Sequence, residues 1–226
     1  MADQEEIRLR GLDAEAVRIL GLLQASTSKQ QIEHYVGQAR RVVQTANAIP
    51  IVQHPARFQQ HIKVTSSLQR VAYHDPDSGG VRDIAEWCLQ RWLRLQQLQS
   101  DTWEVYKGLG QAWLFKSQIF LARIHQIEAS TKGKGKDDEG ALHSPNHVEA
   151  RATLVPATEH FSRAASVLER KGAANGELLA LCAEAFMSLG NISYSRTNET
   201  YFVQAVQYLR KASKIPGYRL PPHMQQ

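Results

Sequence analysis

The chain has 226 residues, of which 42% are hydrophobic, so it is long enough and apolar enough to bury a substantial core. It carries 27 Lys and Arg against 22 Asp and Glu, and the resulting net charge of +5 permits acidic partners without requiring them. Cys88 and Cys182 lie inside apolar helical patterns, which argues against a disulfide framework. Neither an apolar leader nor a membrane-length apolar run is present, so we expect a cytoplasmic or nuclear protein without membrane contacts.

Helical periodicity runs through almost the whole sequence, whereas strand-type alternation is absent. In chain order, the pattern predicts helices over 13–25, 28–48, 55–73, 81–98, 103–127, 146–171, 176–195 and 199–214. Residues 131–145 are rich in glycine and charge and have little to bury, which predicts a disordered loop. The proline-containing residues 217–226 are expected to form an extended tail. We expect one helical-repeat domain over residues 1–226.

Two patterns recur along these helices. The even-numbered helices share a row of small and apolar residues that begins at Ala39, Ala85, Ala157 and Ala205. Three odd-numbered helices carry Leu-Gly one turn after Val or an aromatic residue, with the glycines at Gly21, Gly110 and Gly190. A glycine inside a helix costs about 1 kcal/mol relative to alanine. A close approach by a neighbouring helix at each glycine would explain the pattern, so it predicts stacked helical hairpins.

The last hairpin of the sequence carries the clearest pattern. Phe186, Leu189 and Gly190, followed by Ala205, Leu209, Ala212 and Pro216, resemble the tetratricopeptide repeat, although the repeats here are spaced less evenly than the family's ~34 residues. The resemblance implies an all-α fold, namely a right-handed α-α superhelix of about four antiparallel helical hairpins. It also implies a concave face that binds a peptide or a helix of a protein partner.

The resemblance further suggests which residues would line that face. Lys107 follows Tyr106 of one signature, and Asn191 follows Gly190 of another. In chaperone-binding members of the family, a Lys and an Asn at such positions grip the terminal carboxylate of a ligand. Here Gln111 stands where the Asn beside Lys107 would be. The resemblance therefore implies a peptide-binding site at Lys107, Gln111 and Asn191, while ordinary helix-surface polarity is the alternative interpretation.

An acidic segment between two predicted helices is the best metal candidate. Asp75, Asp77, Asp83 and Glu86 occupy positions 1, 3, 9 and 12 of an EF-hand-like loop, but position 5 is Gly79 and position 8 is Arg82. We interpret the segment as a polar turn, with Asp83 near a helix N-terminus, and expect neither a metal nor another cofactor.

Basic residues on the even-numbered helices suggest a second function, a basic helical scaffold that contacts nucleic acid. The residues are Arg40, Arg41, Arg91, Arg94, Arg210, Lys211 and Lys214. A solvated helix face explains them equally, and no base-reading motif accompanies them. No phosphate-binding loop, nucleophile elbow or zinc spacing occurs either. We therefore expect a non-enzymatic adaptor or scaffold subunit whose partner is a protein.

Overall fold

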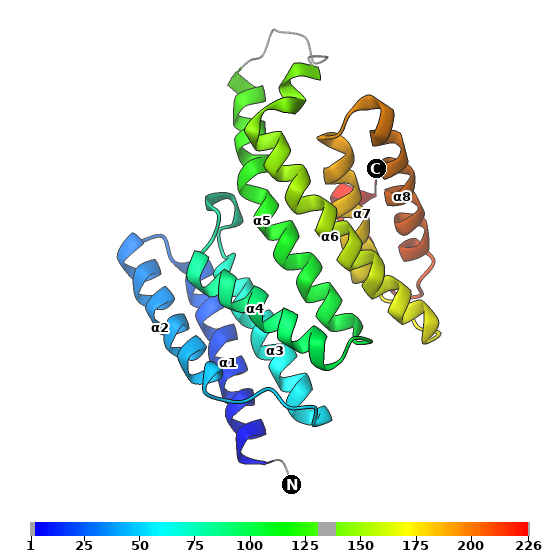
Figure 1. Cartoon of the computed structure of the whole chain (residues 1–226). Helices are drawn as coiled ribbons and strands as arrows, with labels where there is room; N and C mark the ends of the chain where they lie inside the picture. Colours follow the sequence, from blue (N-terminus) through cyan, green and yellow to red (C-terminus); the bar gives the residue numbers. More distant parts are fainter. Residues whose placement is uncertain (1–2, 131–138, 226) are drawn as a thin grey trace. The chain divides into compact units, whose positions relative to one another are not determined.

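A computed structural model describes residues 3–130 and 139–225, and within these it consists of helices without a strand (Figure 1). The predicted all-α class is confirmed. The α-helices are α1 (Gln4–Ala25), α2 (Lys29–Asn47), α3 (Pro55–Ala72), α4 (Arg82–Leu98), α5 (Trp103–Ser130), α6 (Pro145–Arg170), α7 (Gly176–Asn191) and α8 (Ser195–Ser213). Short 3-10 helices are η1 (Pro76–Ser78), η2 (Glu139–His143) and η3 (Pro222–Met224).

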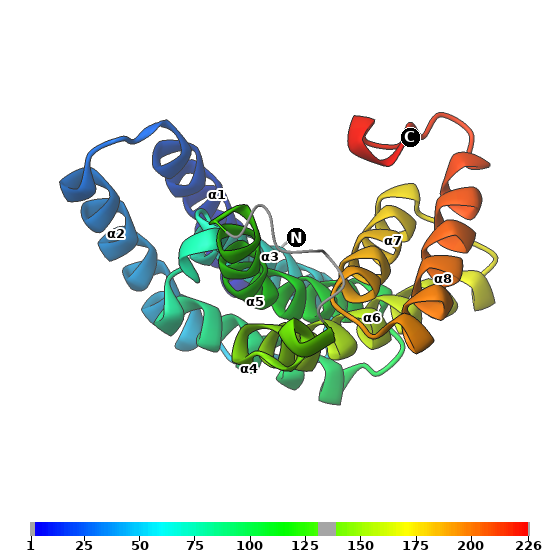
Figure 2. The same cartoon turned by 90° about the horizontal axis from the view of Figure 1, so that it is seen from above.

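The chain divides into two compact units, Met1–Gly108 and Leu109–Gln226, and the boundary falls inside α5. That residues 1–226 fold together as one repeat domain stays a prediction. Consecutive helices of each unit alternate in direction, so each unit is built from consecutive hairpins (Figures 1 and 2).

The first unit is organised around α3. Along this helix Phe58, Val64, Leu68 and Val71 are essentially inaccessible to solvent. Helix α1 packs between α2 and α3, and α4 covers another side of α3 (Figure 1). At the end of this unit, Gly108 lies so close to the buried ring of Trp92 that an added Cβ would stand 2.4 Å from it. A methyl group therefore cannot be placed there without moving the indole.

In the second unit α7 packs between α6 and α8 (Figure 2). Two of the three signature glycines lie at helix contacts, as predicted. A Cβ on Gly110 would stand 2.6 Å from the ring of Phe161, and one on Gly190 would stand 2.8 Å from the ring of Phe202. The prediction is wrong for Gly21 of the first unit, which is exposed and has nothing within 4 Å of its Cβ position. The Val17 pattern is therefore not a structural copy of the other two.

Several boundaries differ from the sequence prediction. Helix α7 ends at Asn191 instead of Ser195, and α8 begins at Ser195 instead of Glu199. Helix α1 begins at Gln4 instead of Asp13, since the Asp3 side chain accepts a hydrogen bond of 2.9 Å from the Glu6 amide and caps it. The first residues of the expected loop, 131–138, lie outside the described residues. The remainder is structured: η2 is followed directly by α6, and Arg151 donates a 2.7 Å hydrogen bond to the Leu142 carbonyl.

The C-terminal tail also departs from the expected extended form. It contains η3, whose Met224 is buried. The ring of Tyr218 lies against Gly176, where an added Cβ would stand 2.2 Å from the ring. The tail thus returns to the start of α7, and the missing side chain of Gly176 makes room for it.

Candidate functional site

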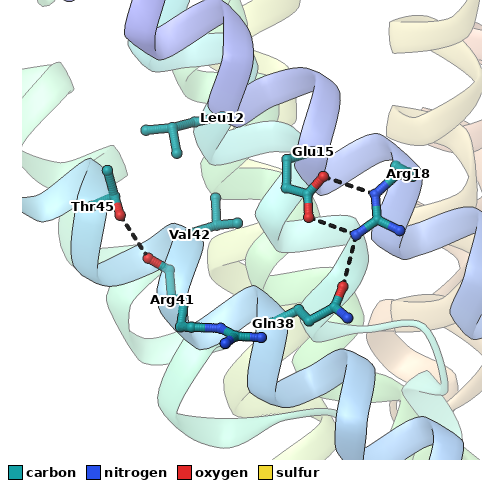
Figure 3. Close-up of a pocket in the computed structure, with 7 residues that line it drawn as sticks. All are labelled: Leu12, Glu15, Arg18, Gln38, Arg41, Val42 and Thr45. Atoms are coloured by element: carbon teal, nitrogen blue, oxygen red, sulfur yellow. Dashed lines mark hydrogen bonds and ion pairs between the residues drawn. The ribbon is translucent and has the colours of Figure 1, made fainter.

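The first unit contains a groove between α1 and α2 that combines an apolar floor with a polar rim (Figure 3). It has a volume of about 400 Å³. The lining residues are Leu12, Glu15, Arg18, Gln38, Arg41, Val42 and Thr45. They recur every three residues on α1 and at three- and four-residue intervals on α2, which places them on the facing sides of the two helices. Pairing of α1 with α2 is therefore what creates the groove.

One end of the groove is fixed by a chain of hydrogen bonds across the helix pair. Arg18 donates to both carboxylate oxygens of Glu15, at 2.8 and 2.6 Å, and to the side-chain oxygen of Gln38 at 2.7 Å (Figure 3). Gln38 in turn lies 2.8 Å from a ring nitrogen of His34. The hydrogen bonds from Arg18 lower the pKa of the Glu15 carboxyl below its ordinary value, and the charge of Arg41 acts in the same direction. Glu15 is therefore ionised at neutral pH, and both of its carboxylate oxygens already accept hydrogen bonds from Arg18.

Arg41 is the cation of this groove that remains available. Its side chain is exposed, and among the described residues it takes part in no ion pair or hydrogen bond through its guanidinium. It points along the groove in the direction of Gln38 (Figure 3). An arginine offers five donors in a planar fork that matches a carboxylate. The groove can therefore hold an apolar side chain on Leu12 and Val42 while Arg41 binds a neighbouring acidic group.

A second groove of similar chemistry lies in the second unit, where the turn between α6 and α7 approaches α8. It has a volume of about 280 Å³ and an apolar floor that includes Leu168, Leu178 and Leu179. Lys211 and Lys214 stand on its rim, and Lys211 lies 3.4 Å from a carboxylate oxygen of Glu169. Both units thus carry an apolar groove with cations at its edge.

The three residues that the family resemblance assigned to peptide binding lie on two helices, α5 and α7. Lys107 and Gln111 are half-buried on consecutive turns of α5, but they belong to different units. Asn191 is exposed as the last residue of α7, and no hydrogen bond joins it to Gln111 among the described residues. A site shared by these three residues stays a prediction.

The predicted basic surface needs one correction. Arg91 is not on the surface: it is only 4% exposed, and it donates hydrogen bonds of 3.2 Å each to the carbonyls of Ala46 and Ile49. It therefore binds carbonyls in the last turn of α2 and just beyond its end, where the regular helical hydrogen bonds run out. The helical spacing could have shown this, because Arg91 shares a face with the buried Cys88 and Leu95.

The remaining basic residues are exposed, but part of their charge is neutralised. Arg40 donates to both carboxylate oxygens of Asp83, at 2.7 and 3.2 Å, and Lys211 is paired with Glu169 as described above. Arg94 lies in a surface groove on α4, and Arg210 and Lys214 are exposed on or beside α8. The cationic surface is smaller than the count of basic residues suggests.

The acidic turn does not bring its carboxylates together. Asp83 is held by Arg40, and Glu86 accepts a 2.7 Å hydrogen bond from Arg82. Gly79 and Gly80 adopt positive φ angles of 92° and 71°, as a tight polar turn requires. Across residues 3–130 and 139–225, no three His, Cys, Asp or Glu side chains lie close enough to hold a metal ion.

No protein-family profile, curated protein or solved structure matches this chain. Of the helices in the described part of the chain, none is both long and apolar enough to cross a lipid bilayer.

Proposed function

We propose that this all-helical protein is a non-enzymatic adaptor or scaffold subunit that binds an acidic, amphipathic segment of a protein partner. The observation that carries the proposal is the α1–α2 groove, where Leu12 and Val42 form an apolar floor beside the exposed Arg41. An amphipathic helix presents apolar and acidic residues on one face at three- and four-residue spacing, which fits such a groove. The groove of the second unit likewise has cations, Lys211 and Lys214, on its rim.

The finer architecture that we propose is a tetratricopeptide-like superhelix. Within the first unit α1 packs against α2, the second helix of its own hairpin, and against α3, the first helix of the next hairpin. Stacked helical repeats pack in this way. Within the second unit Gly110 and Gly190 let neighbouring helices approach at matching signature positions. These contacts support stacked hairpins inside each unit.

Several groups that could serve catalysis are in the wrong state for it. Glu15 is held ionised by Arg18, and a carboxylate with a lowered pKa is a weak proton acceptor at neutral pH. Burial raises the pKa of the Cys88 thiol, and burial likewise raises that of Cys182 to about 12. Neither thiol supplies a thiolate nucleophile at neutral pH. These properties support a binding role over an enzymatic one.

Nucleic-acid binding is the competing proposal, and the side-chain contacts favour it less. Arg91 is buried, and the carboxylates of Asp83 and Glu169 neutralise Arg40 and Lys211. Phosphate binding needs several exposed, unpaired cations on one surface.

The proposal can be tested by selecting ligands from a displayed library of random peptides of about 16 residues, which span about 24 Å as helices. The wild-type chain should enrich peptides with acidic and apolar residues three or four positions apart. Arg41→Glu should bind these peptides at least about tenfold more weakly, because it places a negative charge on the rim.

Lys63→Glu is the matched control, since Lys63 is an exposed cation of the first unit on α3 and does not line the groove. It changes the net charge by the same amount and should leave the affinity unchanged. Equal weakening by both substitutions would mean that only overall charge matters, and the groove proposal would then be wrong. Failure to enrich any peptide would also contradict it.

A further inference from the structure

Helix α8 presents two lengthwise rows of residues on opposite sides. The inner row packs on α7 and contains the buried Ala205 and Ala212. The outer row is Glu199, Val203, Val206 and Arg210, whose spacing of four, three and four residues keeps it on one face. Residues of the two rows differ by two positions, about 200° around the helix. The outer row therefore faces away from α7.

The outer row is apolar at its centre and charged at its ends. Val203 is 48% exposed and Val206 is 43% exposed. Together with Phe202 they line a shallow groove of about 440 Å³ whose lining comes from α8 alone. Glu199 and Arg210 stand at the two ends of this groove, and among the described residues neither side chain forms an ion pair. Single exposed valines are ordinary on protein surfaces. Two of them on one helix face, between an acidic and a basic residue, form a patterned surface, which we call the seam.

We propose that the outer face of α8 binds the same face of a second copy of this chain, with the two helices antiparallel. Glu199 and Arg210 are equally far along the helix from the midpoint between Val203 and Val206. A two-fold axis at that midpoint therefore places Glu199 opposite Arg210 of the second copy, twice, and Val203 opposite Val206, twice. A two-fold contact requires such a self-complementary surface.

The charges select the direction of pairing. In a parallel pair, Glu199 would face Glu199 of the second copy, and Arg210 would face Arg210 of the second copy. Both like-charge contacts would be repulsive. In the antiparallel pair both contacts are attractive. The seam is short compared with interfaces of about 1,200–2,000 Å², so we expect a reversible dimer with a dissociation constant of about 10–100 µM. This surface is separate from the α1–α2 groove and does not depend on the function proposed for it.

Sedimentation equilibrium of the full chain, at about 5 to 500 µM, tests the proposal. The wild-type mass should rise from monomer toward dimer over this range. Arg210→Glu and Glu199→Arg should each raise the dissociation constant at least about tenfold, because each creates two like-charge contacts. The double variant Glu199→Arg/Arg210→Glu restores opposite charges and should dimerise like the wild type. Arg219→Glu, an exposed charge change outside the seam, is the control.

The direction of pairing is tested by cysteine cross-linking. Val203→Cys chains mixed with Val206→Cys chains should form a disulfide-linked mixed pair, and the native Cys88 and Cys182 are buried and should not react. Helical content measured by circular dichroism checks that each variant folds. The proposal would be overturned by a monomeric mass at every concentration or by a dimer that the charge variants leave unchanged. It would also be overturned if the double variant did not recover dimerisation, or if Val203→Cys chains cross-linked with one another.

Discussion

The guanidinium of Arg91 donates a hydrogen bond of 2.8 Å to Nδ1 of His61, deep in the first unit. Because arginine can only donate, Nδ1 is the acceptor and the proton of neutral His61 is on Nε2, which lies 3.2 Å from the Pro50 carbonyl and donates to it. Burial, followed by the charge of Arg91, lowers the pKa of His61 from 6.5 to about 4. The folded state therefore holds this imidazole neutral, in contact with a cation.

This arrangement predicts a pH dependence of stability. The unfolded chain binds a proton at His61 below about pH 6.5, whereas the folded chain binds it only near pH 4. The free energy of unfolding therefore has its full value above pH 6.5 and falls as the pH drops from 6.5 to about 4. The contribution is about 3 kcal/mol at most. Urea unfolding at about pH 7 and about pH 5 should show a smaller pH effect in His61→Gln than in the wild type. An equal pH effect in both proteins would contradict the assignment.

The second prediction concerns the other member of the pair. Arg91→Met removes the donor to Nδ1 of His61 and to the carbonyls of Ala46 and Ile49, of which Ala46 still accepts from the Ile49 amide, so it should reduce the free energy of unfolding by about 3 kcal/mol. Arg94→Met, at an exposed arginine on the same helix, should change it by about 0.5 kcal/mol or less. Equal effects in the two variants, measured by urea unfolding, would mean that the buried hydrogen bonds contribute nothing specific.

The third prediction compares glycines that share a sequence pattern but differ in surroundings. Gly110→Ala should destabilise the fold by about 1–3 kcal/mol, since its Cβ would meet the fully buried ring of Phe161. Gly190→Ala should cost less, because the ring of Phe202 is only half-buried and has room to shift. Gly21→Ala should stabilise by up to about 1 kcal/mol, as it adds helix propensity in open space. Thermal unfolding should therefore rank the midpoint temperatures as Gly21→Ala highest, Gly190→Ala next and Gly110→Ala lowest. Any other order would contradict these contacts.

Helical periodicity was sufficient to predict the helices and most of their limits, because apolar spacing reports directly on which face is buried. It placed the start of α1 too late, since the capping role of Asp3 depends on one side-chain hydrogen bond. It also grouped Arg91 with surface residues by its charge, although its spacing with Cys88 and Leu95 marks a buried face.

The candidate groove could not be predicted from the sequence. Its floor and rim come from both α1 and α2, and the rotation of one helix against the other decides which side chains face each other. The resemblance to a repeat family predicts a binding face at Lys107, Gln111 and Asn191 instead, because it carries over positions from the family's regular repeat. The pairing of Arg40 with Asp83 joins residues 43 positions apart and has no local signal.

The fourth prediction concerns salt. If Arg41 binds an acidic group at the groove rim, the affinity for a selected peptide should fall as salt is raised, because exposed charge pairs are screened over about 8 Å at physiological ionic strength. Arg41→Gln should bind more weakly at low salt and respond less to added salt than the wild type. Fluorescence anisotropy of a labelled peptide measures both quantities. Parallel salt curves for the two proteins would place the acidic contact elsewhere.

The most direct test of the binding proposal is to map where a selected peptide contacts the chain. Backbone amide NMR shifts of the isotope-labelled full-length protein, followed during titration with that peptide, report the contact residue by residue. We predict that the largest changes fall on residues 12–18 and 38–45, which line the α1–α2 groove, with saturation at the same peptide concentration as the anisotropy signal. Changes confined to α4 around Arg94, or to α8 around Arg210 and Lys214, would contradict the account.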